Sequence, residues 1–387
     1  MGNLKKVPEI RFPEFKKDWG SKKFGDLTER ISIPVAVEKS NMYQQIGIRS
    51  HGKGIFHKEL VDGKSLGNKR VFWVQENCLV VNIVFAWEQA VAKTTANEKG
   101  MIASHRFPMY AAKENKSDVD YLLHFFLTTK GKKLLELASP GGAGRNKTLG
   151  QKEFEKLNFL IPEQKEQQKI AQFLSTLNSK ITQLNDKLNL LEQYKKGVMQ
   201  KLFSQELRFK DENGKVFPNW QKKKLGECLE YEQPTNYLVS DTEYDEKYDI
   251  PVVTAGKTFI LGYTNEKEGV FRENLPVIIF DDFTTASQFV DFPFKTKSSA
   301  MKILKPKGNI DVKFMFEALQ MIKYETGGHG RHWISIFSQM DILLPSPKEQ
   351  AKIASFLSKI DAKIDQIKIQ IEQNQEWKKG LLQKMFC

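Results

Sequence analysis

The sequence is poor in cysteine and histidine. Its 387 residues include 3 cysteines, which are far apart and show no CxxC spacing. That pattern argues against a disulfide framework and a zinc site, and it favours a reducing compartment. The 6 histidines are scattered, and the single close pair, His329 and His332, lies in a loop, where it would make a poor metal site. We therefore expect no metal centre.

The sequence also lacks a long hydrophobic run. The longest apolar stretch, residues 79–87 (LVVNIVFAW), is too short to span a bilayer. The first residues, MGNLKKVPEIRFPEF, lack the apolar core of a signal peptide. These features predict a cytoplasmic protein.

Familiar catalytic motifs are missing too. The sequence has no GxxxxGK[ST] phosphate loop, no HExxH pair and no NPPY-like element of the kind that amino-methyltransferases use. Asp281 and Asp282 follow the apolar run PVIIF and could be a nuclease carboxylate pair, but no well-placed Glu-x-Lys companion accompanies them. A structural acidic pair at a strand end is the interpretation we favour, and we expect a chain without catalytic activity of its own.

Positive charge is abundant. The formal net charge is +13 and the pI is about 9.3, in a chain of ordinary globular composition that is long enough for two or three domains. Such a basic excess favours a polyanionic partner, either nucleic acid or an anionic membrane surface. For a cytoplasmic protein, nucleic acid is the better hypothesis.

A long element occurs twice in the chain. Residues 161–204 and 344–387 align without a gap at an offset of 183, and about 19 of 44 aligned positions are identical. The copies contain the phrases PEQKEQQKIAQFLS and PSPKEQAKIASFLS. Further upstream, Trp19 and Gly25 recur as Trp220 and Gly226 at an offset of about 201. The chain is therefore a tandem duplication.

Both copies have the pattern of a long helix with a heptad seam. Apolar residues recur at alternating steps of 4 and 3, which is typical of a left-handed coiled coil. The seam residues are Leu177, Ile181, Leu184, Leu188 and Leu191 in the first copy, and Ile360, Ile364, Ile367, Ile371 and Asn374 in the second. Such helices need a partner, and we expect antiparallel pairing of the two copies; parallel pairing or pairing with another subunit stays open.

Asn374 interrupts the second seam at the position aligned with Leu191. It could fix the register of the pair, or the seam could fray there, with Tyr194 and Trp377 taking over the packing. The lysine pairs 195–196 and 378–379 could be a solvated face, or they could meet phosphates or an acidic partner. The sequence does not decide between these alternatives.

Each half repeats one order of segments. Short β-rich runs precede a helical pattern, a Gly-Gly-x-Gly-Arg loop, a strand and then the long helix. This order predicts a mixed α/β (α+β) fold with two globular domains, at residues 1–160 and 205–343, each followed by a long repeated helix, at residues 161–204 and 344–387.

The polar residues of turns and glycine loops are the candidate DNA contacts. Phosphate contacts give affinity, whereas Arg and Asn side chains can read guanine and adenine edges through two hydrogen bonds. Glycine in such loops lets the backbone come close to DNA. The candidates are Arg49, His51, Lys53, His105, Arg106, Arg145, Asn146 and Lys147 in the first half, and Lys295, Lys297, His329, Arg331 and His332 in the second.

The phrase P…KEQxKIAxFLS…KI, present twice and each time after a divergent segment, resembles the specificity subunit of type I restriction–modification systems. The resemblance covers the whole chain. It implies that each recognition domain binds one half of a two-part DNA target and that the paired helices set the unspecified spacer. It also implies partners: two modification subunits, which bind S-adenosylmethionine and methylate adenine, and restriction subunits, which use ATP and magnesium.

Two rival hypotheses remain at this stage. A coiled-coil scaffold with two protein-binding heads would show little dependence of its affinity on salt, whereas phosphate contacts predict a steep loss. A nuclease that uses Asp281 and Asp282 would cleave DNA by itself with magnesium. The sequence does not give the half-site bases, the spacer length or the partner contacts.

Overall fold

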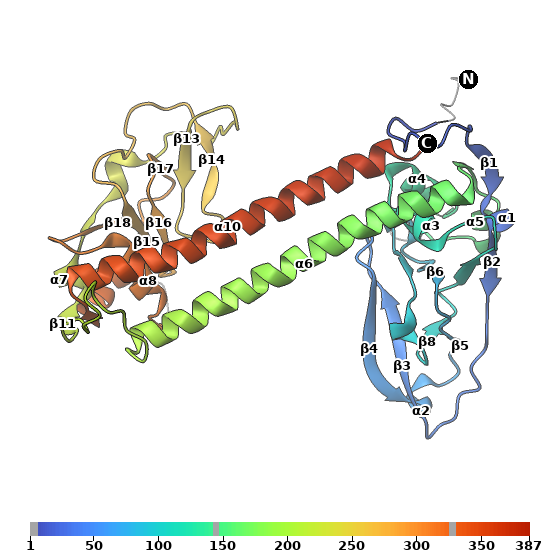
Figure 1. The fold of residues 1–387 in the computed structure, drawn as a ribbon, viewed down its shortest axis with the longest axis horizontal. Helices are drawn as coiled ribbons and strands as arrows, with labels where there is room; N and C mark the ends of the chain where they lie inside the picture. The colour runs from blue at the N-terminus through green and yellow to red at the C-terminus, as the bar shows by residue number, and fades with distance from the viewer. Residues whose placement is uncertain (1–6, 142–146, 325–329) are drawn as a thin grey trace. The chain divides into compact units, whose positions relative to one another are not determined.

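The computed structural model describes residues 7–141, 147–324 and 330–387. The chain divides into two compact units (Figure 1). Unit 1 comprises Met1–Asn185 and Ile369–Cys387, and unit 2 comprises Asp186–Lys368. Each of the two long helices, α6 (Gln164–Phe203) and α10 (Pro347–Lys384), lies partly in unit 1 and partly in unit 2.

Unit 1 contains the strands that the short β-rich runs of the first half predict. Its strands are β1 (Gly20–Lys23), β2 (Thr28–Ile31), β3 (Met42–Ile48), β4 (Ile55–Asp62), β5 (Val71–Trp73), β6 (Cys78–Val81), β7 (Val91–Lys93), β8 (Ile102–Ser104), β9 (Met109–Ala112) and β10 (Asn158–Ile161). Its short helices are α1 (Phe24–Leu27), α2 (Gly63–Leu66), α3 (Val119–Phe126), α4 (Thr129–Leu137) and α5 (Gln151–Glu155), with 3₁₀ turns η1 (Ala86–Glu88) and η2 (Ala96–Glu98).

The strands of unit 1 form sheets of order β2-β9-β6-β7 and β4-β3-β8-β5, together with the ribbon β1-β10. The pairings are antiparallel except for β3 with β8, which is parallel. Helix α3 begins directly after Asp118, because the Asp118 carboxylate accepts a hydrogen bond from the Tyr121 amide at 2.9 Å and so caps the helix.

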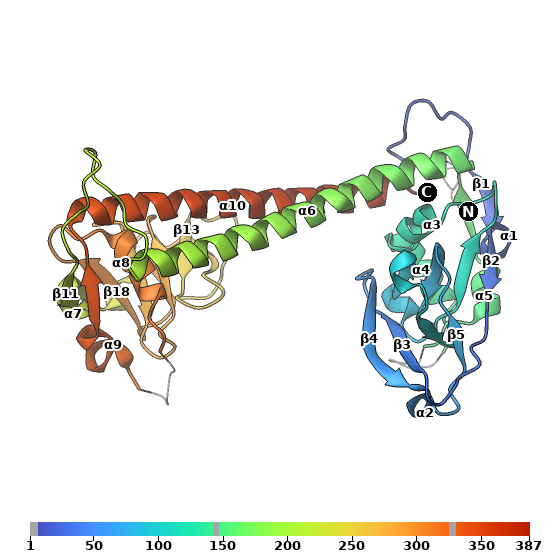
Figure 2. The same cartoon turned by 60° about the horizontal axis from the view of Figure 1, so that its bottom comes forward.

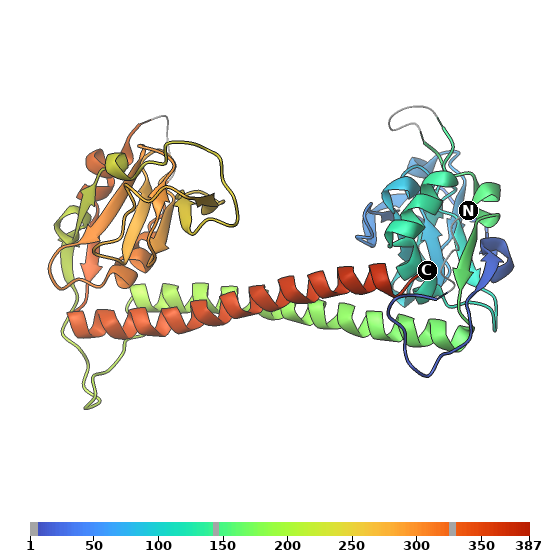
Figure 3. The same ribbon diagram turned by 90° about the horizontal axis from the view of Figure 1, so that it is seen from above.

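The core of unit 1 joins α3 to the ends of both long helices. Phe125 of α3 stacks on Phe159 of β10 and lies 6.2 Å from the ring of Phe386, just beyond α10. Leu174 of α6 and Leu381 of α10 belong to the same buried cluster. In this unit, therefore, the first part of α6 lies beside the last part of α10, as Figure 3 also shows.

Unit 2 repeats this composition with its own elements. Its strands are β11 (Gln221–Lys224), β12 (Leu229–Glu232), β13 (Ile250–Val253), β14 (Ile260–Thr264), β15 (Val277–Asp281), β16 (Ser287–Val290), β17 (Lys295–Thr296), β18 (Met301–Pro306) and β19 (Asp341–Leu344). Its short helices are α7 (Leu225–Cys228), α8 (Val312–Gln320) and α9 (His332–Ser335), with 3₁₀ turns η3 (Pro234–Tyr237) and η4 (Phe337–Gln339).

The sheet topology of unit 2 matches that of unit 1. Sheet β12-β18-β15-β16 corresponds to β2-β9-β6-β7, sheet β14-β13-β17 to β4-β3-β8, and ribbon β11-β19 to β1-β10. The pairing of β13 with β17 is parallel, as is that of β3 with β8. The mixed α+β fold and the tandem duplication are confirmed, although the β-rich segments of the two halves have little sequence in common.

In unit 2 the last part of α6 packs beside the first part of α10 (Figure 2). Leu188 and Leu191 pack against the cluster that contains Ile360 and Ile364. Together with the opposite arrangement in unit 1, this makes the pair antiparallel, as expected. The seam isoleucines of α10 are buried, whereas Ile181, Leu184, Leu188 and Leu191 of α6 are half-buried.

Asn374 does not end the second helix. Its side-chain amide donates to the carbonyl of Gln370 in the same helix at 2.6 Å, and α10 continues to Lys384. Trp377 is 52% exposed but meets Phe173 edge-on, with ring centroids 5.8 Å apart. An aromatic contact thus follows the interruption, while Tyr194 stays 53% exposed.

Within residues 7–141, 147–324 and 330–387, no helix combines the length and the apolar character that a membrane crossing requires.

Candidate nucleic-acid interface

The glutamate of the repeated KEQ phrase holds the start of each globular segment to its long helix. In unit 1 the Glu166 carboxylate is 1% exposed and accepts two hydrogen bonds of 2.7 Å from the Arg11 guanidinium. It also accepts one of 3.3 Å from the Trp19 indole. The hydrogen bond to Glu166 raises the pKa of Arg11, so this arginine stays charged.

Unit 2 repeats this clamp with Glu349, which is fully buried. Its carboxylate accepts hydrogen bonds from Arg208 at 3.1 and 2.8 Å and from the Trp220 indole at 3.0 Å. The sequence identified the repeated tryptophan, but it did not identify the arginine or the role of the glutamate. We refer to both arrangements as the Glu clamps.

The next residue of the phrase, a glutamine, ties the long helix to the neighbouring short helix. Gln167 accepts from the Asp118 amide at 3.0 Å and donates to the Pro162 carbonyl at 2.9 Å. Gln350 does the same with Asp311 at 2.9 Å and Pro345 at 2.8 Å. The repeated phrase thus attaches each globular segment to its long helix.

In unit 1 several candidate residues gather around the corner that follows β6, residues 82–89. The β3–β4 turn is joined to this corner by a bond from the His51 amide to the Glu88 carbonyl at 2.7 Å. The Arg106 carbonyl accepts from the Ile83 amide at 3.0 Å. The Lys147 ammonium lies 5.6 Å from the Trp87 ring. We call this region the unit 1 corner.

The candidate side chains at the unit 1 corner are basic and mostly exposed. Arg49 lies over the Phe56 ring at 4.8 Å, and Lys147 is half-buried. The exposed candidates of this corner are Arg49, His51, Lys53, His105 and Arg106. Arginine and lysine at an exposed edge suit phosphate contacts, and two-donor arginine suits guanine.

Sequence reasoning missed the hollow in this corner. A cavity of about 450 Å³ is lined by residues that include Asn82, Phe85, Phe107 and Lys58. Phe85 is 37% exposed, so an aromatic face accompanies the basic groups. Aromatic surfaces of this kind can stack against bases. Residues 84–89 (VFAWEQ) bring aromatic and polar residues together, and this pattern is the sequence signal that could have indicated the cavity.

Unit 2 has an equivalent corner after β15. Asp281 starts its turn by accepting from the Phe283 amide at 2.9 Å, as Asn82 accepts from the Val84 amide at 3.1 Å in unit 1. Phe283 is 39% exposed, and the exposed Arg331 precedes α9. Asp282 joins the corner to the loop that carries the exposed Lys297, because its amide donates to the Ala300 carbonyl at 3.1 Å.

Two candidates of unit 2 lie inside the fold. Lys295 is 3% exposed, and its ammonium pairs with Glu266 at 2.6 Å and donates to the Glu268 carbonyl at 2.8 Å. His332 is also 3% exposed, and its amide donates to the Asp282 carbonyl at 2.9 Å. We leave both side chains out of the candidate surface. Arg145, Asn146 and His329 lie outside the described residues.

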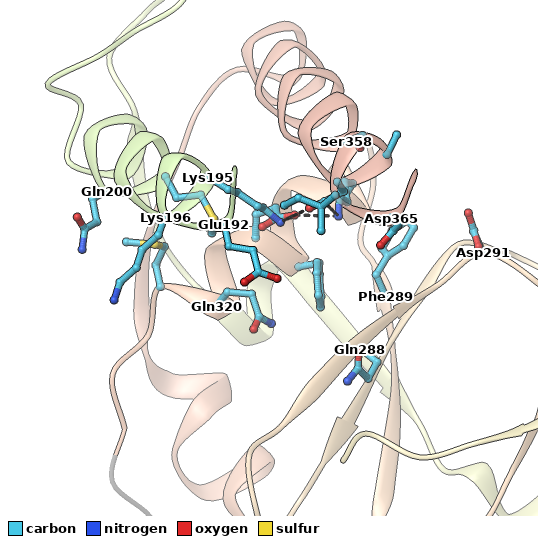
Figure 4. A pocket seen from close by; sticks show the side chains of 18 of the residues that line it. Glu192, Lys195, Lys196, Gln200, Gln288, Phe289, Asp291, Gln320, Ser358 and Asp365 are labelled. Carbon is cyan, nitrogen blue, oxygen red and sulfur yellow. Dashed lines mark hydrogen bonds and ion pairs between the residues drawn. The ribbon is translucent and has the colours of Figure 1, made fainter. Parts of the chain in front are cut away.

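A second feature of unit 2 is a cleft of about 880 Å³ between α8, β16 and the long helices. Figure 4 shows Lys195 and Lys196 from α6, Ser358 and Asp365 from α10 and Gln288 from β16 around it. The cleft has an apolar floor that includes Phe289, Phe316 and Ile364. We call it the unit 2 cleft.

A partly buried charge network crosses the unit 2 cleft. Glu317 is fully buried and pairs with Lys195 at 3.0 Å and Lys313 at 2.8 Å. Asp361 pairs with the same lysines at 2.7 and 2.8 Å. Burial raises the pKa of the Asp361 carboxyl, but the hydrogen bonds from both lysines outweigh it and hold the pKa below its usual value. One oxygen of Glu317, Oε2, has no hydrogen-bond partner among the described residues.

Replacing Asp361 by asparagine should reduce stability most at neutral pH. Because the folded-state pKa is depressed, the carboxylate adds stability above its ordinary pKa of 3.8, and this stability is lost as the pH falls through the folded-state value. At pH 7 we expect Asp361→Asn to cost about 1–3 kcal/mol, and the difference from the wild type to shrink toward pH 3. Urea unfolding at several pH values measures both.

Asp365→Asn is the control for this prediction, since Asp365 is exposed and lines the same cleft. It should change stability by no more than about 0.5 kcal/mol. A pH-independent loss on Asp361→Asn would contradict the ionic explanation.

Unit 1 has the equivalent cleft, of about 650 Å³, between α3 and the long helices. Asn178, Lys378 and Lys379 line it at the positions of Asp361, Lys195 and Lys196, at the repeat offset of 183. His124 takes the place of Glu317: each is buried, and each lies six residues beyond the aspartate that caps its helix. We call this the unit 1 cleft.

The buried side chain of the unit 1 cleft is an uncharged imidazole, whereas that of the unit 2 cleft takes part in a network of ion pairs. Burial lowers the pKa of His124 to about 4, so its imidazole is uncharged near pH 7. Burial also lowers the pKa of Lys378. The Nδ1 atom of His124, like Glu317 Oε2, has no hydrogen-bond partner among the described residues. The two clefts therefore share their place between a short helix and the long helices, and each is lined by a residue with a buried polar atom that has no hydrogen-bond partner among the described residues.

The nuclease hypothesis finds little support in this geometry. The Asp282 carboxylate is 1% exposed and pairs with Lys302, while Asp281 starts the turn described above. In the part of the chain that the structure describes, no three His, Cys, Asp or Glu side chains are grouped to hold a metal ion.

The fold is that of several solved specificity subunits. The S subunit of a type I restriction–modification system from M. genitalium superposes with a TM-score of 0.66 at 15% identity, over 98% of this chain and 99% of that one. The HsdS subunit from Thermoanaerobacter tengcongensis gives a TM-score of 0.50 at 14% identity, over 99% of each chain. At these identities the likeness concerns the fold.

Sequence comparisons agree. The EcoR124I/EcoR124II specificity subunit of Escherichia coli is 48% identical over 141 residues, which is 35% of this chain and 35% of that protein. A putative type I restriction enzyme MjaX specificity subunit from Methanocaldococcus jannaschii is 24% identical over 411 aligned positions, covering 98% of this chain and 95% of that protein.

A family model settles the classification. The model for the type I restriction modification DNA specificity domain matches residues 17–193 and again residues 218–374. The two matches together cover most of the chain. The protein belongs to this family of DNA specificity proteins, as the resemblance of the KEQ repeat had indicated.

Proposed function

We propose that this chain is the DNA sequence-specificity subunit of a type I restriction–modification complex. It binds a two-part DNA target, one half with each globular segment, and directs adenine methylation or cleavage by partner subunits. The observation that carries this proposal is the duplication itself: two segments of the same topology each bear an exposed corner with basic residues, and both are attached to one antiparallel helix pair.

The charge of the chain supports the DNA contact. A net charge of +13 supplies the long-range attraction to a polyanion. Arg49, Arg106 and Lys147 at the unit 1 corner, and Lys297 and Arg331 at the unit 2 corner, supply local contacts of the kind that fix a protein on the duplex and read base edges. The exposed Phe85 and Phe283 add aromatic faces to the two corners.

The paired clefts support two copies of one partner. Each lies between a short helix and the two long helices, and each carries lysines at matching positions. We assign them to two modification subunits, and we expect the restriction subunits to join through that assembly. On this proposal the chain has no catalytic site of its own and works in the cytoplasm. S-adenosylmethionine, ATP and magnesium belong to the partner subunits.

Mapping methylated adenines tests the function directly. DNA from cells that carry this chain with its modification subunit should show adenine methylation at one two-part motif with a fixed spacer. The purified chain with that subunit should bind this motif with an affinity that falls steeply as salt rises. Methylation without any shared motif, or an affinity insensitive to salt, would favour the protein-binding scaffold.

Arg331→Ala tests the unit 2 corner. If the exposed guanidinium reads one base pair through two hydrogen bonds, its loss should weaken binding to the cognate motif by about 1–3 kcal/mol and relax the sequence requirement at that position. Competition binding with substituted oligonucleotides measures both effects. Arg272→Ala, which removes an exposed arginine from the same unit, should leave the sequence preference unchanged. Equal effects of the two substitutions would remove Arg331 from the base contacts.

A further inference from the structure

The start of α9 in unit 2 is fixed by a single buried residue. Asp282 is 1% exposed, and its carbonyl accepts from the His332 amide at 2.9 Å. Its carboxylate Oδ1 accepts from the Trp333 amide at 2.8 Å. These are the first two residues of α9, and they directly follow the exposed Arg331.

A lysine sits opposite this carboxylate. The Lys302 ammonium lies 3.3 Å from Asp282 Oδ2, and both side chains are 1% exposed. The same ammonium lies 5.1 Å from the Tyr231 ring. The pair is therefore sealed inside the unit, next to a Trp333 ring that is 2% exposed and meets Phe280 at 5.3 Å.

Unit 1 makes the backbone contact without the ion pair. The Leu149 amide donates to the Ile83 carbonyl at 2.8 Å, just as His332 donates to Asp282. The sheet register places Ile83 at the position of Asp282, and Pro108 at the position of Lys302. An apolar pair therefore suffices to build this corner of the fold, and the ion pair is an addition found in unit 2.

Stability does not explain that addition. A buried ion pair loses solvation, and well-packed apolar residues of similar volume often stabilise a protein as much or more. The carboxylate instead fixes the position and orientation of the start of α9, because its hydrogen bond with the Trp333 amide forms in only one arrangement of the two groups. The position of the helix start in turn sets the position of the exposed Arg331, which directly precedes it. The Ser335 hydroxyl also donates a hydrogen bond to the Arg331 carbonyl at 2.8 Å.

We propose that Asp282 is a positioning residue for sequence reading by unit 2, acting through Arg331. Lys302 neutralises the buried carboxylate, and the hydrogen bond to the Trp333 amide sets where Arg331 meets the DNA. The inference rests on the proposed function, and it assigns the effect to one half of the target alone.

Two neutral double variants isolate the hydrogen bond. Asp282→Asn with Lys302→Met removes both charges but keeps a side-chain acceptor for the Trp333 amide. Asp282→Leu with Lys302→Met removes the acceptor as well and imitates the apolar pair of unit 1. Each is assembled as the full chain with the modification subunit, and methylation is measured on duplexes substituted in one half-site or the other.

We expect the first variant to keep the wild-type discrimination at both halves within about 2-fold. The second should lose about 10-fold of discrimination in one half only, which is the size of a weakened base contact. It should also be non-additive with Arg331→Ala, since both changes act on the same contact. Equal behaviour of the two variants, loss in both halves, or additivity with Arg331→Ala would overturn the proposal.

Folding is checked by thermal unfolding of each complex. Should the leucine variant fail to assemble, Asp282→Ala with Lys302→Met carries the same test with a smaller side chain. The failure of the proposed function itself has a different signature, because the wild-type complex would then show no sequence preference in either half.

Discussion

Replacing Glu349 by alanine should cost the protein about 3–5 kcal/mol of stability, because it leaves a largely buried guanidinium without its counter-charge. Arg208 is 16% exposed and Glu349 is fully buried, so water replaces little of the lost contact. The buried Trp220 indole loses its acceptor in the same step. Urea unfolding monitored by tryptophan fluorescence measures the loss, and Glu166→Ala should have a similar effect through Arg11 and Trp19.

Two controls belong with this prediction. Glu349→Gln keeps an acceptor of the same shape and should recover part of the loss, since the hydrogen bond to the indole can still form. Glu372→Ala, an exposed position on the same helix, should change stability by no more than about 0.5 kcal/mol. A loss below about 1 kcal/mol on Glu349→Ala would mean that the clamp is not a major attachment.

Lengthening both long helices by one heptad should abolish methylation of the original motif and create methylation at a motif with a longer spacer. Seven helical residues add about 10 Å, which corresponds to about three base pairs of duplex DNA. The insertion is made after Leu184 in α6 and at the facing level of α10, so that the 4–3 spacing of both seams is kept. Methylated-site mapping reads the outcome.

The control inserts five residues in place of seven in each helix. Five residues rotate the following part of each seam by about 140°, so the apolar positions beyond the insertion no longer face the partner helix, and assembly rather than spacing should suffer. An unchanged spacer after the heptad insertion would show that the helix pair does not set the half-site separation.

The parts of the fold that the sequence predicted are those with strong local periodicity. The heptad seams predicted two long helices, and every seam residue lies within α6 or α10. The helical pattern predicted before the glycine loop of the first half includes α3, where an aspartate cap and apolar spacing lie next to each other in the chain. The domain boundaries stay predictions, since the compact units cut through both long helices.

The parts that the sequence did not reveal depend on residues that are far apart in it. Arg11 and Glu166 are 155 residues apart, and nothing local to either marks them as partners. Lys295 and His332 have residue types that suggest a surface, but both are buried: Lys295 pairs with Glu266, and the His332 ring lies against the Tyr324 ring. Each cleft is formed by elements that are far apart in the chain. The two clefts are equivalent because residues at matching positions of the repeat line both of them, which requires knowing which residues lie together in the fold.

The Glu clamps make each globular segment a cassette. At this joint the long helix binds few groups of the globular segment. They are an arginine and a tryptophan near the start of the segment, and one backbone amide at the cap of its short helix. All of these can be supplied by a segment whose surface corner has entirely different residues. Recombination that exchanges such cassettes would therefore change the DNA that is read while the joint stays intact.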